Sequence, residues 1–96
     1  MNMKKPSHDT LEREVVIVNE LGLHARSAGK IAALARQAVA AIRIEKGGEN
    51  VDARSIIDIL SLECTRGTKI RIAAASPKDM DILNQLAALV KNGCGE

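Results

Sequence analysis

The pattern of apolar and polar positions along the chain predicts four β-strands. Apolar residues recur at every second position in two of them, which is typical of a strand with one buried face, and the first is indicated by a run of β-branched residues. The Gly47-Gly48 pair separates two of these strands and predicts a hairpin, so the two should be antiparallel neighbours. The expected strands cover residues 14–19, 41–45, 50–53 and 68–75, with Ile42, Ile44, Val51, Ile70, Ile72 and Ala74 facing inward.

Three helices are expected between and after these strands. The first should span residues 25–36, with a narrow stripe formed by Ala28, Ile31, Ala32, Ala35 and Ala38. The third should begin at Ser76, with Pro77 in its first position and Asp79 as an acid in its first turn, and should end at about residue 93. Its apolar stripe is expected to consist of Met80, Leu83, Ala87 and Val90.

The second helix is short and unusually apolar. Ser55 and Asp58 have the spacing of a capping box and indicate that the helix begins at Ser55. The apolar residues of this segment are Ile56, Ile57, Ile59, Leu60 and Leu62. They cannot all point toward one core, so some of them must be exposed. We favour an exposed patch that binds a partner over simple packing at the edge of the domain.

The order of elements is strand, helix, strand, strand, helix, strand, helix, with short connections. It predicts an α+β domain in which three helices cover one face of a four-stranded antiparallel sheet. Residues 1–12, which include His8, are polar and without a pattern, and we expect them to form a flexible tail. The domain itself should span residues 13–93.

The composition excludes several classes of function. The chain has no Phe, Tyr or Trp and a net charge of only +2, so a nucleic-acid partner is not expected. Cys64 and Cys94 match no metal-ligand spacing, and we expect two reduced thiols and no metal or cofactor. No stretch resembles a signal peptide or reaches transmembrane length. A cytoplasmic protein without membrane insertion is therefore expected.

The candidate chemistry lies at the junction between the first strand and the first helix. His24 stands just before the expected helix and Arg26 follows two residues later. Unpaired backbone N–H groups and the helix dipole favour an anion there. A neutral imidazole is a nucleophile, and an ordinary histidine, with a pKa of about 6.5, is largely neutral near pH 7. A guanidinium group such as that of Arg26 can hold phosphoryl oxygens. The alternative interpretation of the same two residues is that His24 only caps the helix and Arg26 is a solvated charge in its first turn.

Two motifs at a characteristic separation resemble the HPr family, the histidine phosphocarriers of the bacterial phosphoenolpyruvate-dependent sugar phosphotransferase system. One is Gly22-Leu23-His24-Ala25-Arg26 with Asn19 before it. The other is Arg54-Ser55-Ile56-Ile57, followed by Leu60-Ser61-Leu62. The resemblance covers about residues 14–92 and implies an open-faced β-sandwich.

The resemblance also implies a function. His24 would accept a phosphoryl group on Nδ1 from phosphorylated Enzyme I and pass it to IIA components, with Arg26 stabilising the group. Ile56, Ile57 and Leu60 would dock both partners. The chain would act as a monomeric covalent relay that needs no cofactor, and not as a stand-alone enzyme.

Three positions depart from the family pattern. Ser27 replaces a usual proline, which implies a looser first turn and a hydroxyl that binds the phosphoryl group or competes with it. Asp58 replaces a usual glycine beside Ser55, the position that an HPr kinase phosphorylates in some bacteria. Its carboxylate would oppose a phosphate there, so we expect Ser55 to act as a helix cap. Glu63, where a small residue is usual, bears on the choice of partner.

Three other functions remain open at this point. The departures suggest a regulatory relay of the nitrogen type or one linked to a sensor kinase. A non-phosphorylated interaction module would keep the fold, but the presence of His24 and Arg26 argues against it. A ferredoxin-like domain that binds a small ligand has the same element order, but no set of polar residues indicates its pocket.

Overall fold

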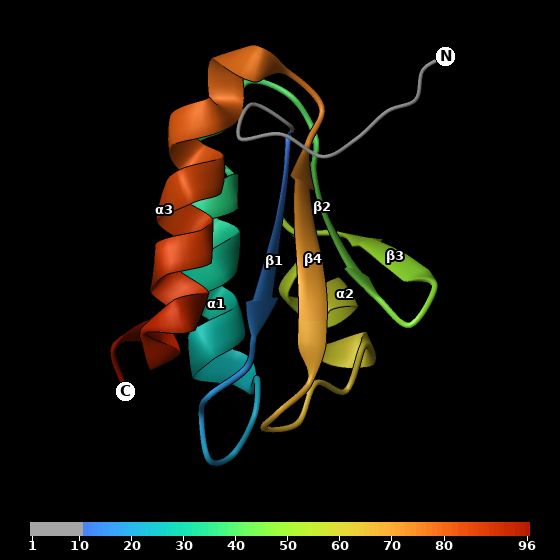
Figure 1. Cartoon of the computed structure of the whole chain (residues 1–96), viewed down its shortest axis with the longest axis vertical. Helices are drawn as coiled ribbons and strands as arrows, with labels where there is room; N and C mark the ends of the chain where they lie inside the picture. Colours follow the sequence, from blue (N-terminus) through green and yellow to red (C-terminus); the bar gives the residue numbers. More distant parts are fainter. Residues whose placement is uncertain (1–10) are drawn as a thin grey trace.

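The computed structural model describes residues 11–96, and these form an antiparallel sheet covered by helices on one face (Figure 1). The predicted α+β architecture is confirmed. The sheet order is β1-β4-β2-β3. In chain order, the elements are β1 (Glu12–Val16), α1 (Ala25–Ala35), β2 (Ile42–Lys46), β3 (Glu49–Asp52), α2 (Ile56–Ser61), β4 (Lys69–Ala74), the 3₁₀ turn η1 (Pro77–Asp79), α3 (Met80–Lys91) and the 3₁₀ turn η2 (Gly93–Gly95).

The central strand β4 sets the register of the sheet. It pairs with β1 on one side, where Val15 lies opposite Ile70, and with β2 on the other, where Ile44 lies opposite Ile72. Because side chains alternate along a strand, these aliphatic residues all face the helices and are buried. Arg43 on β2 faces the opposite, exposed side of the sheet. The predicted inward faces of β2 and β4 are confirmed.

The helical layer packs on the sheet through small and aliphatic side chains. Four residues of the predicted stripe of α1 are confirmed, because Ala28, Ile31, Ala32 and Ala35 are fully buried where α1 packs on α3 and α2. The fifth, Ala38, lies beyond the end of the helix at Ala35 and is only partly buried. In α3, Leu83, Leu86 and Val90 are buried, whereas Met80 and Ala87 are only partly covered. The expected stripe therefore omitted Leu86, which lies three residues after Leu83 and four before Val90, a spacing that places all three on one helix face.

The first strand differs most from its predicted bounds. Strand β1 begins two residues earlier and ends three residues earlier than expected. The carbonyl of Leu11 accepts a hydrogen bond from Ala74 N–H at 2.9 Å, so residues 11 and 12 belong to the sheet rather than to the expected tail. The chain leaves the β1–β4 ladder after Val16, although Ile17 still donates to the Thr68 carbonyl at 2.8 Å. His8 lies outside the described residues.

The start of the third helix holds a buried carboxylate that the sequence indicated only as a first-turn acid. Ser76 caps a 3₁₀ turn, and α3 proper begins at Met80. The two carboxylate oxygens of Asp79 accept the N–H groups of Val39 and Ala40, at 2.8 and 2.9 Å. Asp79 therefore joins the start of α3 to the loop that follows α1, which fixes one end of the helical layer.

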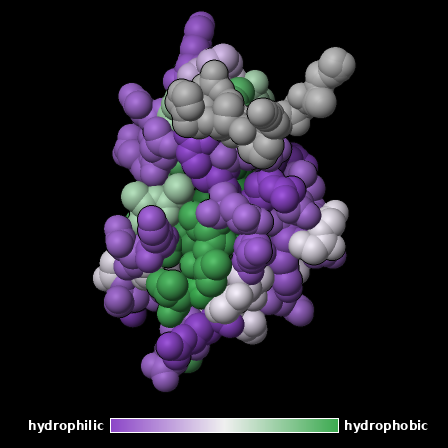
Figure 2. Space-filling model, viewed as in Figure 1, coloured by the Kyte–Doolittle hydropathy of each residue, from purple (hydrophilic) through white to green (hydrophobic). Residues whose placement is uncertain are grey.

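An apolar groove runs between the edge strand β1 and α3 (Figure 2). Val15, Val16, Ala87 and Ala88 are among the residues that line it. Val16 is exposed because it alternates with the buried Val15 and its side chain therefore faces the side of the sheet that the helices do not cover. The groove contains none of the residues that the sequence indicated for function.

Candidate functional site

The loop that carries His24 is held in place by the segment that follows α2. Leu23 donates its N–H to the Cys64 carbonyl at 2.9 Å, and Gly22 precedes it with a positive φ of 70°. A Cβ atom at position 22 would clash with the Cys64 carbonyl. Gly22 is therefore required both for its backbone conformation and for this close approach.

His24 is the N-cap of α1, which confirms that it lies at the start of the helix. Its backbone is extended, and its Nδ1 atom accepts the backbone N–H of Arg26 at 3.3 Å. The His24 carbonyl accepts the first helical hydrogen bond, from Ala28 N–H at 2.8 Å. The imidazole is thus attached directly to the positive end of the helix dipole. The first turn of α1 contains no acidic residue.

Ser27 reinforces this arrangement, and its hydroxyl does not face a ligand. It accepts the His24 backbone N–H at 2.9 Å and donates to the His24 carbonyl at 3.1 Å. Ser27 is fully buried. The expectation that its hydroxyl would bind or compete with a phosphoryl group is therefore wrong, because both of its hydrogen bonds lie within the cap. These two hydrogen bonds also restrain the first turn of α1, where this chain has Ser27 in place of the usual proline of the family.

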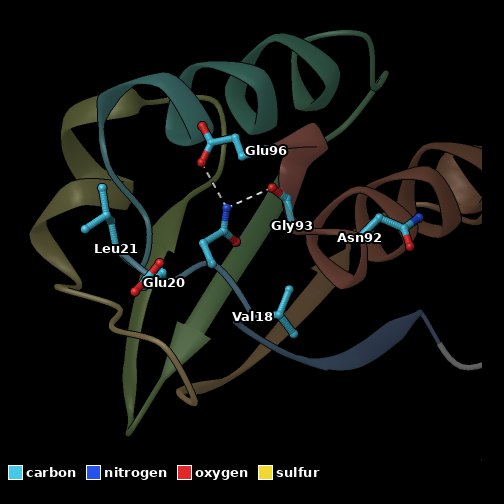
Figure 3. A pocket seen from close by; sticks show the side chains of 7 residues that line it. Val18, Glu20, Leu21, Asn92, Gly93 and Glu96 are labelled. Atoms are coloured by element: carbon cyan, nitrogen blue, oxygen red, sulfur yellow. Dashed lines mark hydrogen bonds between the residues drawn. The ribbon is translucent and has the colours of Figure 1, made fainter.

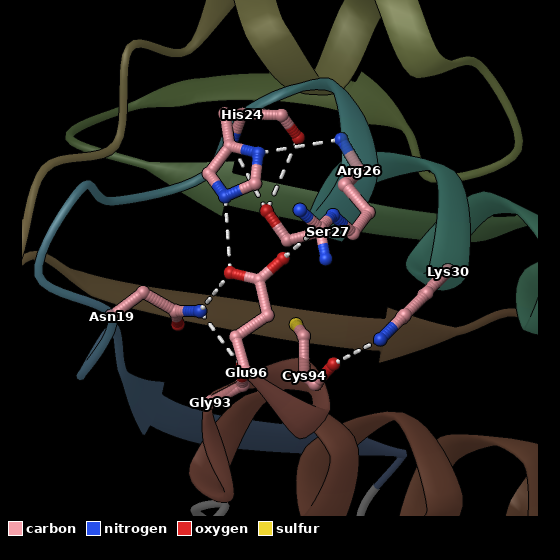
Figure 4. Close-up of polar contacts among 8 residues, drawn as sticks. All are labelled: Asn19, His24, Arg26, Ser27, Lys30, Gly93, Cys94 and Glu96. Carbon is pink, nitrogen blue, oxygen red and sulfur yellow. Dashed lines mark hydrogen bonds and ion pairs between the residues drawn. The ribbon is translucent and has the colours of Figure 1, made fainter.

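Glu96 completes the site and was not expected from the sequence. Its Oε1 atom lies 3.0 Å from His24 Nε2 and accepts the side-chain N–H of Asn19, also at 3.0 Å (Figure 4). Its Oε2 atom lies 3.9 Å from Arg26 Nε, a long ion pair. Three elements thus contribute to the site: the loop after β1, the start of α1 and the segment after α3.

The segment after α3 is bent back over the start of α1 by successive residues with positive φ. Gly93, Cys94 and Gly95 have φ values of 72°, 56° and 77°. Asn19 donates to the Gly93 carbonyl at 2.8 Å, and Lys30 donates to the Cys94 carbonyl at 2.8 Å. The signal in the sequence was the Gly93-Cys94-Gly95 run, which suits a left-handed turn, but the domain was expected to end at residue 93.

The ionisation of Glu96 determines how His24 is protonated. Desolvation acts to raise the pKa of the Glu96 carboxyl, but hydrogen bonds from His24 and Asn19 outweigh it and hold this pKa below its ordinary value. The carboxylate is therefore ionised near neutral pH and can only accept hydrogen bonds. Since neutral His24 has one ring proton, we assign that proton to Nε2, and Nδ1 keeps its lone pair.

Comparison with known proteins identifies the family to which this site belongs. A family model described as "PTS HPr component phosphorylation site" matches residues 11–92. The chain belongs to the HPr family. It is therefore a phosphocarrier-type component of the phosphotransferase system.

Relatives of both HPr and NPr type are similar to this HPr-family chain. It is 34% identical to the phosphocarrier protein HPr of Cupriavidus necator over 86 residues, which cover 90% of this chain and 97% of the relative. It is 40% identical to the phosphocarrier protein NPr of Shewanella violacea over 80 residues, which cover 83% and 88%.

Solved structures of HPr proteins share the fold. The HPr-C-His structure from Thermoanaerobacter tengcongensis is 30% identical, with a TM-score of 0.79, and the match covers 88% of this chain and 96% of that one. An HPr dimer from the same organism is 28% identical, with a TM-score of 0.67 and coverage of 98% and 100%.

Arg26 is the cation of the site, and its side chain is 74% exposed. Its backbone N–H is already used on His24 Nδ1, whereas its guanidinium reaches only the distant oxygen of Glu96. The side chain can therefore turn toward an anion at the start of α1 without breaking a buried contact. The structure thus brings His24 and Arg26 together, as the sequence indicated.

The short helix α2 of this HPr-family protein has an N-cap and a partly exposed apolar surface. The Ser55 hydroxyl accepts the Asp58 N–H at 3.1 Å, which confirms the predicted cap. Ile57 is 78% exposed, while Ile56 and Leu60 are half-buried. Leu21, in the loop before His24, is 82% exposed and had not been singled out. The remaining apolar residues of the segment, Ile59 and Leu62, belong to the core.

A cavity lies beside the histidine site (Figure 3). It opens between residues 18–21 and the end of α3, and Glu96 forms part of its wall. Asn19 is only 8% exposed, and its two hydrogen bonds are both donated by Nδ2. Its Oδ1 atom is buried and has no hydrogen-bond partner among residues 11–96. Asn19 thus acts through its amide N–H groups, which hold the segment after α3 against the loop.

The two cysteines are free and buried. Burial raises the pKa of the Cys64 and Cys94 thiols, and both are therefore protonated at neutral pH.

No group of three or more metal-ligating side chains occurs within residues 11–96. Over the same range, no helix is long and apolar enough to cross a membrane.

Glu63, the third departure from the family pattern, has a positive φ of 53° in the turn after α2.

Proposed function

We propose that this chain accepts a phosphoryl group on His24 from phosphorylated Enzyme I and passes it to IIA components of the phosphotransferase system. The lone pair assigned to Nδ1, next to a helix N-terminus and an arginine, is the observation that carries the proposal. The protein would act in the cytoplasm as a monomeric relay without metal or cofactor.

The transfer is a displacement at phosphorus. The Nδ1 lone pair forms the new N–P bond while the bond between phosphorus and the donor group of Enzyme I breaks, and that group leaves with the electron pair. The N–H groups at the start of α1 and the Arg26 guanidinium face the phosphoryl oxygens as charge shifts among them. The same step in reverse delivers the group to an acceptor.

Partner docking is proposed for the apolar surface of α2. Ile57 is exposed on this helix, with Ile56 and Leu60 beside it. Leu21 lies in the loop that leads to His24. An apolar surface of this kind is suited to partners that must approach closely and then dissociate, because it contributes binding without a fixed set of ion pairs.

The direct test combines the protein with Enzyme I and phosphoenolpyruvate. An acid-labile phosphorylated species should form, and His24→Ala should abolish it. His8→Ala, which removes the other histidine of the chain, is the matched control and should leave the reaction intact. Persistence of the phosphorylated species in His24→Ala would exclude this site.

A regulatory relay of the nitrogen type is the second candidate. It is favoured by the 40% identity to an NPr protein and by Asp58, which departs from the HPr pattern beside Ser55. The two candidates differ in their acceptor. Transfer to a regulatory IIA protein without transfer to a sugar-specific one would support the regulatory relay, and equal transfer to both would argue against it.

A further inference from the structure

Glu96 binds the imidazole nitrogen opposite the one proposed to carry the phosphoryl group. We propose that Glu96 is a positioning residue that directs phosphorylation to Nδ1 of His24 and stabilises the ring when it becomes positively charged. The proposal rests on His24 being the phosphoryl acceptor. It adds to that function a residue outside the matched family region, which ends at residue 92.

Two contacts act together on the imidazole. Glu96 Oε1 lies 3.0 Å from Nε2, while the Arg26 backbone N–H donates to Nδ1. An ionised carboxylate cannot donate, so Nε2 must supply the proton, and a backbone N–H cannot accept, so Nδ1 must supply the lone pair. Each contact therefore favours the same tautomer. Glu96 also covers Nε2, so that this nitrogen is not available as a nucleophile.

The charge of the ring changes during transfer. When neutral His24 attacks through Nδ1 and keeps the Nε2 proton, the imidazole becomes a phosphorylated cation. The Glu96 carboxylate is hydrogen-bonded to the nitrogen that keeps the proton, so it stabilises this cation. Phosphohistidine is hydrolysed faster when its ring is protonated. A carboxylate at Nε2 should therefore extend rapid hydrolysis to higher pH.

The position of the carboxylate is set by its neighbours and does not depend on His24 alone. Asn19 donates to the same Oε1 atom, and Lys30 holds the preceding turn through the Cys94 carbonyl. Glu96 N–H also donates to the Gly93 carbonyl at 3.0 Å. The charged groups that contact the carboxylate are His24 and Arg26, while Lys30 donates to the Cys94 carbonyl in the preceding turn and Glu20 shares the wall of the adjacent cavity.

The test uses potassium phosphoramidate as the phosphoryl donor, with the full chain and no Enzyme I. In this reaction, the P–N bond of phosphoramidate breaks, ammonia leaves, and the imidazole nitrogen takes the phosphoryl group. NMR of the product distinguishes Nδ1-phosphohistidine from Nε2-phosphohistidine. Wild-type protein should give mainly the Nδ1 product, and Glu96→Ala should raise the ratio of Nε2 to Nδ1 product about fivefold, as expected for loss of one partly exposed charged contact.

Two further variants separate charge from shape. Glu96→Gln keeps an oxygen that can accept from Nε2 but removes the charge, so hydrolysis of the phosphorylated protein should accelerate only at lower pH than in wild type. Glu20→Gln removes the same charge nearby without touching His24 and should match wild type in both measurements. An unchanged product ratio in Glu96→Ala, or an unchanged hydrolysis profile in Glu96→Gln, would overturn the proposal.

The unmodified protein gives an independent measurement. Nitrogen chemical shifts of the His24 ring near neutral pH should show the proton on Nε2 in wild type and a larger share on Nδ1 in Glu96→Ala. Equal shifts in the two proteins would also overturn the proposal. Labelling by phosphoramidate without labelling by Enzyme I would instead remove the proposed relay function and leave the role of Glu96 in place.

Discussion

The starts of α1 and α2 are built alike and yet offer an anion very different surroundings. Each helix begins with an extended residue whose side chain accepts a backbone N–H of the first turn: His24 in α1 and Ser55 in α2. The first turn of α1 has no acidic residue, whereas α2 carries Asp58 there. The helix dipole attracts negative charge at both starts. At the start of α2 this charge is already supplied by Asp58, whereas the first turn of α1 supplies none.

The negative charge near α1 comes from a different part of the chain. Glu96 reaches the site from the segment after α3 and binds the far side of the imidazole. It does not enter the first turn of α1, whereas Asp58 lies within the first turn of α2. We therefore expect the position of a carboxylate relative to a helix start to decide whether it supports phosphorylation or opposes it.

The largest effect is expected for Arg26, which has no counterpart in the first turn of α2. Arg26→Ala should lower the rate of His24 phosphorylation by Enzyme I about thirtyfold, corresponding to loss of a charge-assisted hydrogen bond worth about 2 kcal/mol. Arg26→Lys should restore part of the rate, since it keeps the charge but not the bidentate geometry. Rates measured by rapid quench would check this. Equal rates for wild type and Arg26→Ala would show that the α1 start acts through its backbone alone.

The two caps should also differ in stability. Ser27→Ala should lower the free energy of unfolding by about 1.5 kcal/mol, because the fully buried Ser27 hydroxyl makes two hydrogen bonds with the His24 backbone and its loss leaves the His24 N–H without an acceptor. Ser55→Ala should cost less, about 0.5–1 kcal/mol, because Ser55 is only partly buried and its hydroxyl accepts a single cap hydrogen bond. Urea denaturation of both variants measures the difference. A larger loss in Ser55→Ala would reverse this ranking of the two caps.

Removing the acid from α2 should make its start more like that of α1. Asp58→Asn keeps the size of the side chain and removes its charge, so an HPr kinase should phosphorylate Ser55 about fivefold faster than in wild type. Phosphate incorporation in the His24→Ala background follows Ser55 separately from the histidine. Glu63→Gln is the charge-matched control in the turn after α2, and it should have little effect. Rapid phosphorylation of Ser55 in wild type would contradict the view that Asp58 protects it.

Most of the fold could be predicted because its signals are local. Alternating aliphatic residues in β2 and β4 and the Gly47-Gly48 hairpin specify the sheet without reference to distant residues. The bounds of β1 were less accurate, because the run of β-branched residues extends past Val16 into a loop that pairs only through Ile17. A β-branched run indicates an extended chain, but its partner strand decides where the ladder ends.

The site was predictable only where its residues are close in sequence. His24 and Arg26 lie in one motif, and the roles proposed for them follow from the start of a helix. Glu96 is far from both and reaches them only because consecutive residues with positive φ reverse the chain after α3. Ser27 was misjudged for a related reason. Whether a hydroxyl faces a ligand or its own helix cap depends on burial, which one position in a sequence does not show.

The smallest expected effect is a change in the acid sensitivity of the protein, and it tests the link between Glu96 and the start of α1. Because the pKa of the Glu96 carboxyl is lower in the folded protein than in the unfolded chain, its stabilising contribution is present above the unfolded pKa. That contribution is lost as the pH falls through the folded pKa. Stability of wild type and Glu96→Gln should therefore differ slightly near neutral pH and converge in acid.

The same titration can be followed at the carboxyl group itself. In His24→Ala, the Glu96 side chain loses one of the two hydrogen bonds that outweigh its desolvation, so carbon NMR should show its pKa moving back toward the ordinary value. Glu20→Gln, which leaves the pair intact, should keep the Glu96 pKa of wild type. If His24→Ala left that pKa unchanged, the carboxylate would owe its ionisation to Asn19 and Arg26, and the start of α1 would not depend on a charge supplied from the segment after α3.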